Sequence, residues 1–324
     1  MSASIIRVLD QYDIRHPDRV QAFGSGGGFS GAQFWRVTVA GREFCLRKWP
    51  RGKPGTDHAK LMYTTLQHVQ QHTQLPLAFP QTPTRGTDPF VKEGGRQWEL
   101  SEWLPGKPVR EHPINPEKLR AAMQMLATFH NATEHIHHGE GNSRAIEFRC
   151  QLIDRLNDGQ LDQIRNASSQ VDTGVKKSFL DQFSIHGGAI RKQLQAVRER
   201  HGPQFPILGD IWSEHVLFTG DQVTGVVDFG AVKVDSYHLD IARLLGSYED
   251  YHPGSIQSGI AEYSAIRHLG ELDRSLIELY DQAYVLLAGI QWLIWIELER
   301  RTFPDWEAVQ QRLERLNRRT PNGH

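Results

Sequence analysis

The fold of this chain is decided by the stretch Ile207-Leu208-Gly209-Asp210-Ile211-Trp212-Ser213-Glu214-His215-Val216-Leu217-Phe218 and its continuation Val226-Val227-Asp228-Phe229-Gly230. Gly220-Asp221 lies between two apolar runs and predicts a tight hairpin turn. Asp210 follows a short strand, and Asp228 ends the strand that returns from the turn. The hairpin therefore brings two carboxylates to one end. One can accept a proton from a hydroxyl group, and the other can hold a divalent cation such as Mg²⁺.

A glycine-rich segment, Gly24-Ser25-Gly26-Gly27-Gly28-Phe29-Ser30-Gly31, precedes a predicted strand. Gly26, Gly27 and Gly28 allow the backbone to approach a phosphate closely and to point its N–H groups at it. The alternative is a flexible loop of small residues. A P-loop is excluded because no Gly-Lys-Ser/Thr follows. The dinucleotide fingerprint fits poorly because the segment leads into a strand rather than a helix.

Arg47 is the candidate phosphate-binding cation. Two alternating runs, residues 34–39 and 43–47, predict an antiparallel hairpin. Because successive side chains of a strand point to opposite faces, Arg47 and Lys48 are expected on opposite faces. Arg47 would face the glycine-rich segment if Leu46 faces the core. The alternative is that both cations are ordinary surface charges.

The predicted elements come in a definite order, with strands first and helices afterwards. A helix over residues 58–71 and a strand over 97–103 follow the hairpin, and Pro105-Gly106-Lys107-Pro108 then breaks the chain. Further helices are predicted after Asn115 and near residues 145–165, 175–200, 238–249, 256–268 and 271–300. This order predicts an α+β fold with two lobes. Residues 1–106 would form a small antiparallel β lobe with one helix, and residues 107–324 a larger, mainly helical lobe that carries the catalytic hairpin.

The composition of the chain limits where the protein is expected to reside and which partners it is expected to bind. The net charge of −1 provides no strong field for nucleic acid or an anionic membrane. Cys45 and Cys150 match no metal-binding spacing and predict reduced thiols, which suits the cytosol. The N-terminal residues lack the pattern of a signal peptide, and the most apolar stretch, residues 285–296, is too short to span a bilayer and predicts a buried helix. We therefore expect a cytoplasmic protein that binds neither nucleic acid nor membrane.

The motifs together resemble a known family. Gly209-Asp210, His215 five positions later and Val226-Val227-Asp228-Phe229-Gly230 look like the catalytic core of aminoglycoside phosphotransferases, and choline kinases and homoserine-kinase-like enzymes are similar. Leu126-Ala127-Thr128-Phe129-His130 resembles the family's Leu-Ala-x-Leu-His helix. Asp240-Ile241-Ala242 resembles its Asp-Leu-Ala helix start. The resemblance implies a two-lobed, protein-kinase-like fold.

The resemblance also implies an activity, namely transfer of the γ-phosphate of ATP to a hydroxyl group of a small molecule, with Mg²⁺ or Mn²⁺ as the metal. Amino alcohols, amino sugars and aminoglycosides are candidate acceptors. Asp210 would be the catalytic base, Asp228 the principal metal ligand, His215 a second ligand and Arg47 the cation on the phosphates. Asp240 would brace the catalytic loop.

Two further parts of the nucleotide site follow from the same resemblance. Ser30 and the neighbouring glycines Gly26, Gly27 and Gly28 would cover the phosphates. Glu102 and Trp103 stand where the backbone of the hinge between lobes meets adenine in this family.

The sequence departs from the family at several positions. His215 replaces an Asn, and an imidazole is a poorer ligand for Mg²⁺ than an amide oxygen. Leu208 and Trp212 replace histidines that are common in the family's loop. The helix over residues 58–71 has no Glu to pair with the phosphate cation, so either His58 or a water substitutes, or the pair is absent.

Alternatives stay open at three points. A nucleotide-binding pseudokinase with a regulatory role is the second candidate function, and His215 is the position that discriminates it from an active enzyme. His130, His135, His137 and His138 could bind a metal, although their spacing fits no standard site and favours a solvated loop. Tyr248-Glu249-Asp250-Tyr251-His252 could line a site for a cationic acceptor, although a solvated helix end is favoured. The oligomeric state and the acceptor are not readable from the sequence.

Overall fold

The computed structural model describes residues 2–23, 31–109, 114–136, 142–198, 202–249, 254–303 and 305–320. The chain divides into two compact units, of which the first consists of Met1–Arg110 and Glu214–Lys233 and the second of Glu111–Ser213 and Val234–His324. The hairpin that carries Asp228 therefore belongs with the N-terminal strands, although the order of the predicted elements places it in the helical lobe. The division into a nucleotide-binding lobe before residue 107 and a catalytic lobe after residue 106 stays a prediction. The fold is α+β, with an antiparallel N-terminal sheet and a helical C-terminal part, as predicted.

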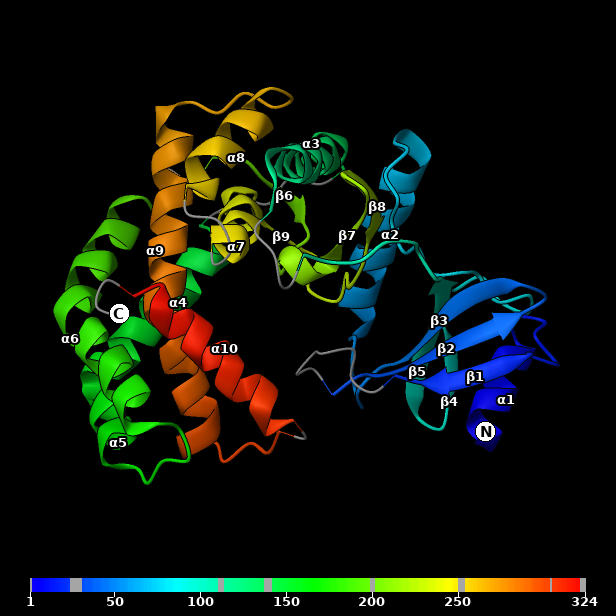
Figure 1. Ribbon diagram of the computed structural model, residues 1–324, viewed down its shortest axis with the longest axis horizontal. Coiled ribbons are helices and arrows are strands. Elements are labelled where there is room, and N and C mark those ends of the chain that lie inside the picture. The colour runs from blue at the N-terminus through cyan, green and yellow to red at the C-terminus, as the bar shows by residue number, and fades with distance from the viewer. Residues whose placement is uncertain are drawn as a thin grey trace. The chain divides into compact units, whose positions relative to one another are not determined.

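An antiparallel sheet of five strands forms the centre of the first unit (Figure 1). Its order is β1-β2-β3-β5-β4, and the bounds are β1 (Arg19–Ala22), β2 (Gln33–Val39), β3 (Arg42–Lys48), β4 (Val91–Glu93) and β5 (Arg96–Glu102). The predicted hairpin is β2 and β3, paired with Trp35 opposite Leu46. Strand β3 pairs on its other side with β5, although α2 (Thr56–His72) separates them in the chain.

One face of this sheet is covered by α1 (Ala3–Asp10), a helix that the sequence analysis does not predict (Figure 1). Ser2 caps the helix by accepting a hydrogen bond from the Ile5 amide at 3.4 Å. The helix and the sheet share one buried cluster of apolar side chains, Ile5, Val8, Leu9, Val37, Phe44, Leu46, Trp98 and Leu100. Because α1 takes the face that carries Leu46, the opposite face carries Arg47.

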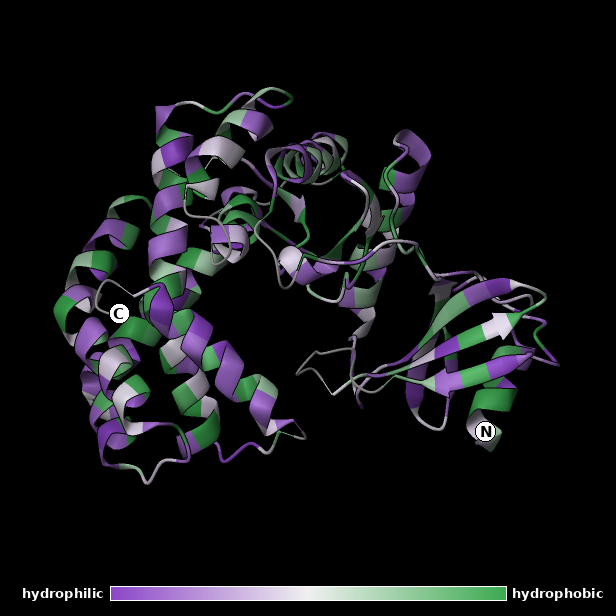
Figure 2. Cartoon of the chain, in the orientation of Figure 1, coloured by the Kyte–Doolittle hydropathy of each residue, from purple (hydrophilic) through white to green (hydrophobic). Residues whose placement is uncertain are grey.

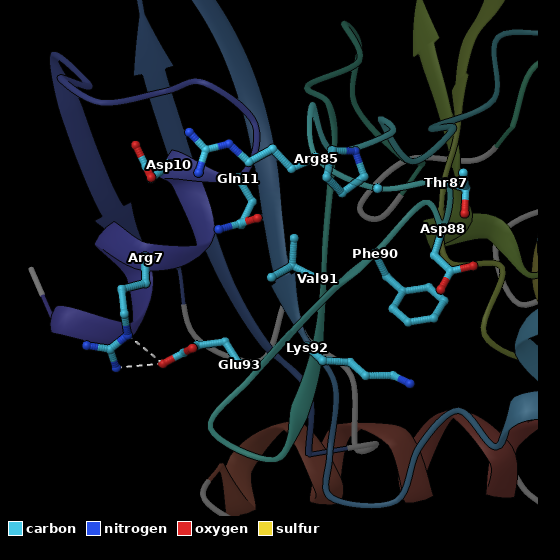
Figure 3. Close-up of a pocket in the computed structure, with 12 residues that line it drawn as sticks. Arg7, Asp10, Gln11, Arg85, Thr87, Asp88, Phe90, Val91, Lys92 and Glu93 are labelled. Carbon is cyan, nitrogen blue, oxygen red and sulfur yellow. Dashed lines mark hydrogen bonds and ion pairs between the residues drawn. The ribbon is translucent and has the colours of Figure 1, made fainter.

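A pocket of about 540 Å³ lies beside α1 (Figure 3). Residues of α1, β4 and the segment 83–93 line it, and Arg7 of α1 donates from Nε to Glu93 Oε1 at 2.8 Å. Most of the lining side chains are charged or polar. The described residues around this pocket include none of the predicted site residues, so it is a feature of the sheet edge rather than the predicted site.

The catalytic hairpin consists of β7 (Val216–Thr219) and β8 (Gln222–Val226), which turn at the predicted Gly-Asp pair. Phe218 and Lys107 exchange both backbone hydrogen bonds, at 2.9 and 3.0 Å. A further backbone hydrogen bond, from Val226 at 2.8 Å, joins the hairpin to the segment after α2. Backbone hydrogen bonds therefore attach the hairpin to two segments, one that precedes β5 in the chain and one that follows it.

Gly106 makes one of these attachments possible. Its φ of +100 lies in the left-handed region that residues with a Cβ rarely adopt. A Cβ at this position would lie 2.5 Å from Thr224 Oγ1 and 2.7 Å from the Phe218 carbonyl oxygen. The predicted chain break at this glycine is therefore the point where the hairpin docks.

Helices make up most of the second unit. Their bounds are α3 (Pro116–Thr133), α4 (Arg144–Arg155), η1 (Leu156–Gln160), α5 (Leu161–Asn166), α6 (Thr173–Ala196), α7 (His238–Glu249), α8 (Ser255–Ser264), α9 (Glu271–Leu293), η3 (Ile294–Leu298) and α10 (Trp306–Arg318). Each predicted helical region contains a helix, although the region 145–165 is broken by non-helical backbone at Asp158 and Gly159 and residues 199–200 lie outside the described residues. Helix α10 was not predicted. Helix α9 packs against α6, α7 and α10. Figure 2 shows hydrophobic and hydrophilic residues mixed along these helices, as expected of amphipathic helices with one buried face.

Two short strands and a single helical turn flank the hairpin in the chain. Strands β6 (Gln204–Ile207) and β9 (Lys233–Ser236) form a two-stranded sheet, and the single turn η2 (Ser213–His215) leads into β7. The predicted short strand before Asp210 is therefore β6.

The structure also bears on the expectations about the apolar stretch, the cysteines and membrane-spanning helices. The apolar stretch over residues 285–296 lies in α9 and η3 and is largely buried, as predicted. Cys45 and Cys150 are free thiols, as predicted. None of the helices in the described ranges is both long enough and apolar enough to span a membrane.

Replacing Gly106 by Ala is expected to lower the free energy of unfolding by about 3 kcal/mol, because the added Cβ would clash in a left-handed backbone. Gly95→Ala is the matched control. Gly95 also has a positive φ, +68, but no atom lies within 4 Å of an added Cβ, so its expected cost is about 1 kcal/mol. Urea unfolding measures both, and equal losses would contradict the close approach at Gly106.

Candidate active site

Arg47 and Lys48 leave β3 on opposite faces of the sheet, as the alternation predicts. Lys48 lies on the α1 side, where its Nζ is 5.1 Å from the centre of the Trp98 ring. Arg47 lies on the other side and is buried, with 7% of its surface exposed. A buried cation requires a negative partner, so the surroundings of Arg47 define the first part of the site.

Arg47 lies between two carboxylates. Its Nη1 is 3.5 Å from Glu99 Oε1 on the neighbouring strand β5, and its Nη2 is 3.1 Å from Asp228 Oδ1. The strand register places Glu99 directly opposite Arg47, so the two side chains share a face. The Trp49 ring packs on the guanidinium, with its centre 3.6 Å from Cζ. These contacts join the sheet to the residue that follows the hairpin.

Glu99 is a site residue that the sequence analysis misses. It supplies the carboxylate beside Arg47 for which residues 58–71 offer no Glu, and α2 contributes Tyr63, whose hydroxyl donates to Glu99 Oε2 at 2.8 Å. Burial and the charge of Glu99 raise the pKa of Tyr63, so the hydroxyl stays protonated and donates. His58 does not pair with Arg47, because its Nε2 lies 3.0 Å from the Gly230 carbonyl oxygen. Only the β3–β5 register, which is not visible in the sequence, would reveal Glu99.

Asp228 adopts a left-handed backbone conformation, with a φ of 63. Such conformations are uncommon for non-glycine residues and are concentrated at functional sites. Burial raises the pKa of Asp228, but Arg47, His215 and the Gly230 amide outweigh this and hold the pKa below its ordinary value. The carboxylate is therefore charged at neutral pH. A glycine is required at position 230, because a Cβ at this position would lie only 2.9 Å from the Trp49 ring.

His215 lies beside Asp228, with 3.9 Å between its Nε2 and Asp228 Oδ2. This distance is too long for a direct hydrogen bond. One guanidinium, that of Arg47, faces two carboxylates, so the site has an excess of negative charge that suits a cation. Among the described residues, no group of three or more His, Cys, Asp or Glu side chains forms a metal site by itself. A cation here would need ligands from outside the protein, as Mg²⁺ on nucleotide phosphates has.

The predicted hinge residues lie at the end of β5. The Trp103 amide donates to the Glu43 carbonyl at 2.9 Å, and the Glu102 carboxylate lies 2.6 Å from Arg42 Nη2. The Trp103 amide is therefore used within the sheet, and the adenine contact of this segment stays a prediction. The predicted phosphate-covering residues lie outside the described residues, namely Gly26, Gly27, Gly28 and Ser30.

Asp210 belongs to the second unit and lies in the loop after β6. Its Oδ1 accepts a hydrogen bond from Arg243 Nε at 3.0 Å, and 54% of its side chain is exposed. Burial lowers the pKa of Arg243, but Tyr284 and Asp210 outweigh this and raise the pKa above its ordinary value. A permanently charged guanidinium therefore orients a carboxylate that solvent can reach.

Asp240 braces the loop that presents Asp210, as predicted. This fully buried carboxylate accepts backbone hydrogen bonds from Leu208 at 2.7 Å and from Gly209 at 2.8 Å. Its Oδ2 also lies 3.2 Å from His130 Nε2. The two residues before Asp210 are thereby fixed by one charged acceptor, and hydrogen bonds of this kind are stronger than those between neutral groups.

His130 is part of this brace rather than of a metal site. Burial lowers its pKa, although Asp240 acts in the opposite direction, so the ring is neutral at pH 7. Nδ1 then accepts from the Tyr263 hydroxyl at 2.8 Å, and Nε2–H donates to Asp240. Two members of the histidine cluster considered above, His137 and His138, lie outside the described residues.

A sequence profile of the phosphotransferase enzyme family matches residues 21–286, which is most of the chain. The chain belongs to this family. The matched range contains the two site carboxylates, Asp210 and Asp228, together with Arg47 and the bracing Asp240. The residues of the candidate site in both units therefore lie inside the range that makes this chain a member of the phosphotransferase enzyme family.

Solved structures share the fold of this phosphotransferase family member. The aminoglycoside phosphotransferase from Alicyclobacillus acidocaldarius matches with a TM-score of 0.65 at 17% identity, covering 95% of this chain and 91% of that chain. Amicoumacin kinase in complex with AMP-PNP and Ca²⁺ matches with a TM-score of 0.63 at 13% identity, covering 94% of this chain and 90% of that chain. At such identities the similarity concerns the fold alone, and it confirms the predicted kinase-like fold.

One curated relative shares sequence with a part of the chain. Homoserine kinase from Methylocella silvestris is 36% identical over 84 residues. This region covers 25% of the chain and 26% of homoserine kinase, so the chain matches about a quarter of the length of that relative.

Asp240→Asn is expected to lower the free energy of unfolding by about 3 kcal/mol, because an amide cannot accept all the buried hydrogen bonds of the carboxylate. Asp181→Asn is the matched control in the same unit, since Asp181 pairs only with Lys177 on the surface of α6. Its expected cost is at most about 0.5 kcal/mol. Urea unfolding compares the two, and similar losses would contradict the role of Asp240 as a brace.

Proposed function

We propose that this protein transfers the γ-phosphate of ATP to a hydroxyl group of a small molecule. The observation that carries the proposal is the environment of Asp228, a charged carboxylate in a left-handed backbone, paired with the buried Arg47 directly after the catalytic hairpin. Family membership and the AMP-PNP and Ca²⁺ present with the related amicoumacin kinase support a nucleotide and a divalent metal as ligands. The test is product formation from ATP with a panel of hydroxyl acceptors.

Each residue has a role that follows from its surroundings. Asp228, with His215, would hold the metal ion that accompanies ATP, and such an ion neutralises charge on the phosphates when bound. Arg47 binds the phosphates as a cation kept in place by Glu99 and the Trp49 ring. Asp210 accepts the proton of the acceptor hydroxyl, with its orientation set by Arg243. Catalysis of this kind depends on positioning and on charge neutralisation.

Mg²⁺ and a place in the cytoplasm are the finer parts of the proposal. The carboxylate of Asp228 suits Mg²⁺, whereas the imidazole of His215 suits Mn²⁺ and later transition metals. The net charge near zero and the two free thiols support a cytoplasmic protein.

A nucleotide-binding pseudokinase is the second candidate function, because His215 stands where the family has a metal-binding Asn. Binding of metal and nucleotide without transfer to any acceptor would favour it. Asp210 supports the active enzyme, because a pseudokinase does not require an exposed, oriented carboxylate on the catalytic loop.

Arg47→Ala is expected to raise the KM for ATP by about tenfold or more, the scale of a lost charge-assisted hydrogen bond. Lys48→Ala is the matched control, because Lys48 leaves the same strand on the opposite face. Steady-state kinetics with varied ATP measure both. The reverse pattern would mean that Lys48 contacts the phosphates.

The two site carboxylates are expected to fail differently. Asp228→Asn should abolish metal-dependent nucleotide binding, measured by calorimetry with and without the metal. Asp210→Asn should leave that binding intact and lower the transfer rate by about a hundredfold or more, the usual scale for a lost general base. If transfer falls by less than about threefold in Asp210→Asn, this carboxylate is not the base.

His215→Asn is expected to shift the metal preference from Mn²⁺ towards Mg²⁺, because an amide oxygen replaces an imidazole nitrogen beside Asp228. The measurement is the ratio of transfer rates in the two metals for the wild type and the variant. An unchanged ratio would show that His215 does not ligate the metal.

A further inference from the structure

Two arginines and two aromatic rings of the second unit gather beside Asp210. We call Trp212, Arg243, Tyr284 and Arg312 the arginine–aromatic cluster. Arg243 Cζ lies 4.3 Å from the centre of the Tyr284 ring, and Arg312 donates from Nη2 to the Tyr284 hydroxyl at 2.6 Å. Both guanidiniums also flank the Trp212 ring, at 5.9 and 4.9 Å. Arg243 touches the cluster and Asp210 at once, so the cluster adjoins the acceptor side of the proposed reaction.

Among the described residues, the carboxylate that pairs with this cluster is Asp210, and it pairs with Arg243 rather than with Arg312. Arg312 is buried, with 8% of its surface exposed, and none of the described residues offers it a carboxylate; its polar partner is the Tyr284 hydroxyl. Burial of an unpaired guanidinium is costly, so such groups normally have an anionic partner. The neighbouring Arg319 has one, because its Nη2 lies 2.7 and 2.8 Å from the two oxygens of Asp281.

Two other groups respond to the same excess of charge. Burial raises the pKa of Tyr284, but Arg243 and Arg312 outweigh this and hold the pKa below its ordinary value. Burial lowers the pKa of Arg149 on α4, Tyr280 and Asp235 act in the opposite direction, and repulsion from Arg243 adds to the lowering. In the described structure Arg149 has no carboxylate within ion-pair distance, and it donates only to the Ala145 carbonyl of its own helix. Arg149 and Arg243 are therefore close enough to repel each other, while Arg312 is the buried guanidinium of the cluster itself that lacks a carboxylate among the described residues.

The acidic segment over residues 248–252 was considered above as a site for a cationic acceptor. Its described carboxylate, Glu249, instead binds backbone amides. The Glu249 carboxylate accepts hydrogen bonds from the Gly254 and Ile256 amides, at 2.8 and 3.1 Å, at the start of α8. Asp250 lies outside the described residues. The one described carboxylate of this segment therefore serves the backbone.

We infer that the acceptor of this enzyme is a small hydroxyl compound that carries an anionic group, which Arg312 and Arg243 bind while Asp210 faces its hydroxyl. The inference rests on the proposed phosphotransfer. The planar fork of a guanidinium matches a carboxylate or a phosphate ester, and the two aromatic rings supply flat walls. Because Arg243 contacts both Asp210 and the cluster, the anionic group and the reacting hydroxyl are close neighbours in the acceptor. A polycationic aminoglycoside does not meet this description.

The test uses acceptors in pairs that differ only in charge. Glycerate is compared with glyceramide, and homoserine with its amide, while glycerol phosphate represents phosphate esters and kanamycin represents polycations. Two measurements are made on the full chain, thermal stabilisation by each compound and the rate of phosphate transfer from ATP. The wild type is expected to be stabilised by the anionic members and to use at least one of them with a kcat/KM about tenfold or more above that of its neutral partner.

Variants on one helix separate the anion site from general effects. Arg312→Gln is expected to raise the KM for the anionic acceptor by about tenfold or more, to leave the KM for ATP unchanged and to remove the preference over the neutral partner. Arg312→Lys keeps the charge without the fork and should retain part of the preference. Arg318→Gln, an exposed change on the same α10, is the matched control and should behave as the wild type. Circular dichroism melts check that each variant is folded.

The outcomes distinguish this inference from the proposed function. Transfer to kanamycin or to the neutral partners as efficient as transfer to the anions would leave the phosphotransfer standing and overturn the anionic acceptor. The absence of stabilisation by every anion, or stabilisation that Arg312→Gln does not change, would also overturn it. Arg312-dependent stabilisation by the anions without any transfer would support the anion site and contradict the proposed activity.

Discussion

The ion pair between Arg47 and Asp228 is the contact on which the proposed nucleotide site depends. It links a buried cation of the five-stranded sheet to the residue that ends the catalytic hairpin, at 3.1 Å. Glu99, Tyr63 and the Trp49 ring hold the guanidinium in one position, so the hairpin end has a fixed partner. Loss of Asp228 would remove one of the two carboxylates that balance the buried Arg47, and Asp228 itself has a left-handed backbone.

The second unit follows the same principle with the charges reversed. There the buried group is a carboxylate, Asp240, and it holds the backbone of the loop that presents Asp210. In both units the group proposed to do chemistry is partly exposed, with side-chain exposures of 39% for Asp228 and 54% for Asp210. The residues that position them, Arg47 and Asp240, are buried. Rigid support beneath reachable carboxylates is what positional catalysis requires.

Much of the fold could be predicted from the sequence because strand alternation, turn pairs and helical periodicity are local signals. The β2–β3 hairpin, the Gly-Asp turn and the order of helices are of this kind. Helix α1 was missed although Ile5, Val8 and Leu9 have helical spacing after a capping Ser2, because the apolar face is short. Strand β1 is short and mostly exposed, and its partner Trp35 lies across a segment that offers no local pairing signal.

The site was predictable only where its residues lie in a local motif. Asp210 and Asp228 follow from their places at one end of a hairpin, Asp240 from the resemblance to the family, and the division of Arg47 and Lys48 between two faces from strand alternation. Glu99 depends on the pairing of β3 with β5, and Arg312 reaches Trp212 and Tyr284 only through the packing of α10. Such long-range contacts have no local signal in the sequence.

The most direct test of the account follows the phosphorus atoms themselves. ³¹P NMR of the full chain with ATP, Mg²⁺ and the acceptor panel should show the γ-phosphate resonance decline while a phosphomonoester resonance and ADP rise in equal amounts. A phosphate resonance from free inorganic phosphate alone, or ATP that stays bound and intact with every acceptor, would contradict a phosphotransferase that acts on hydroxyl groups.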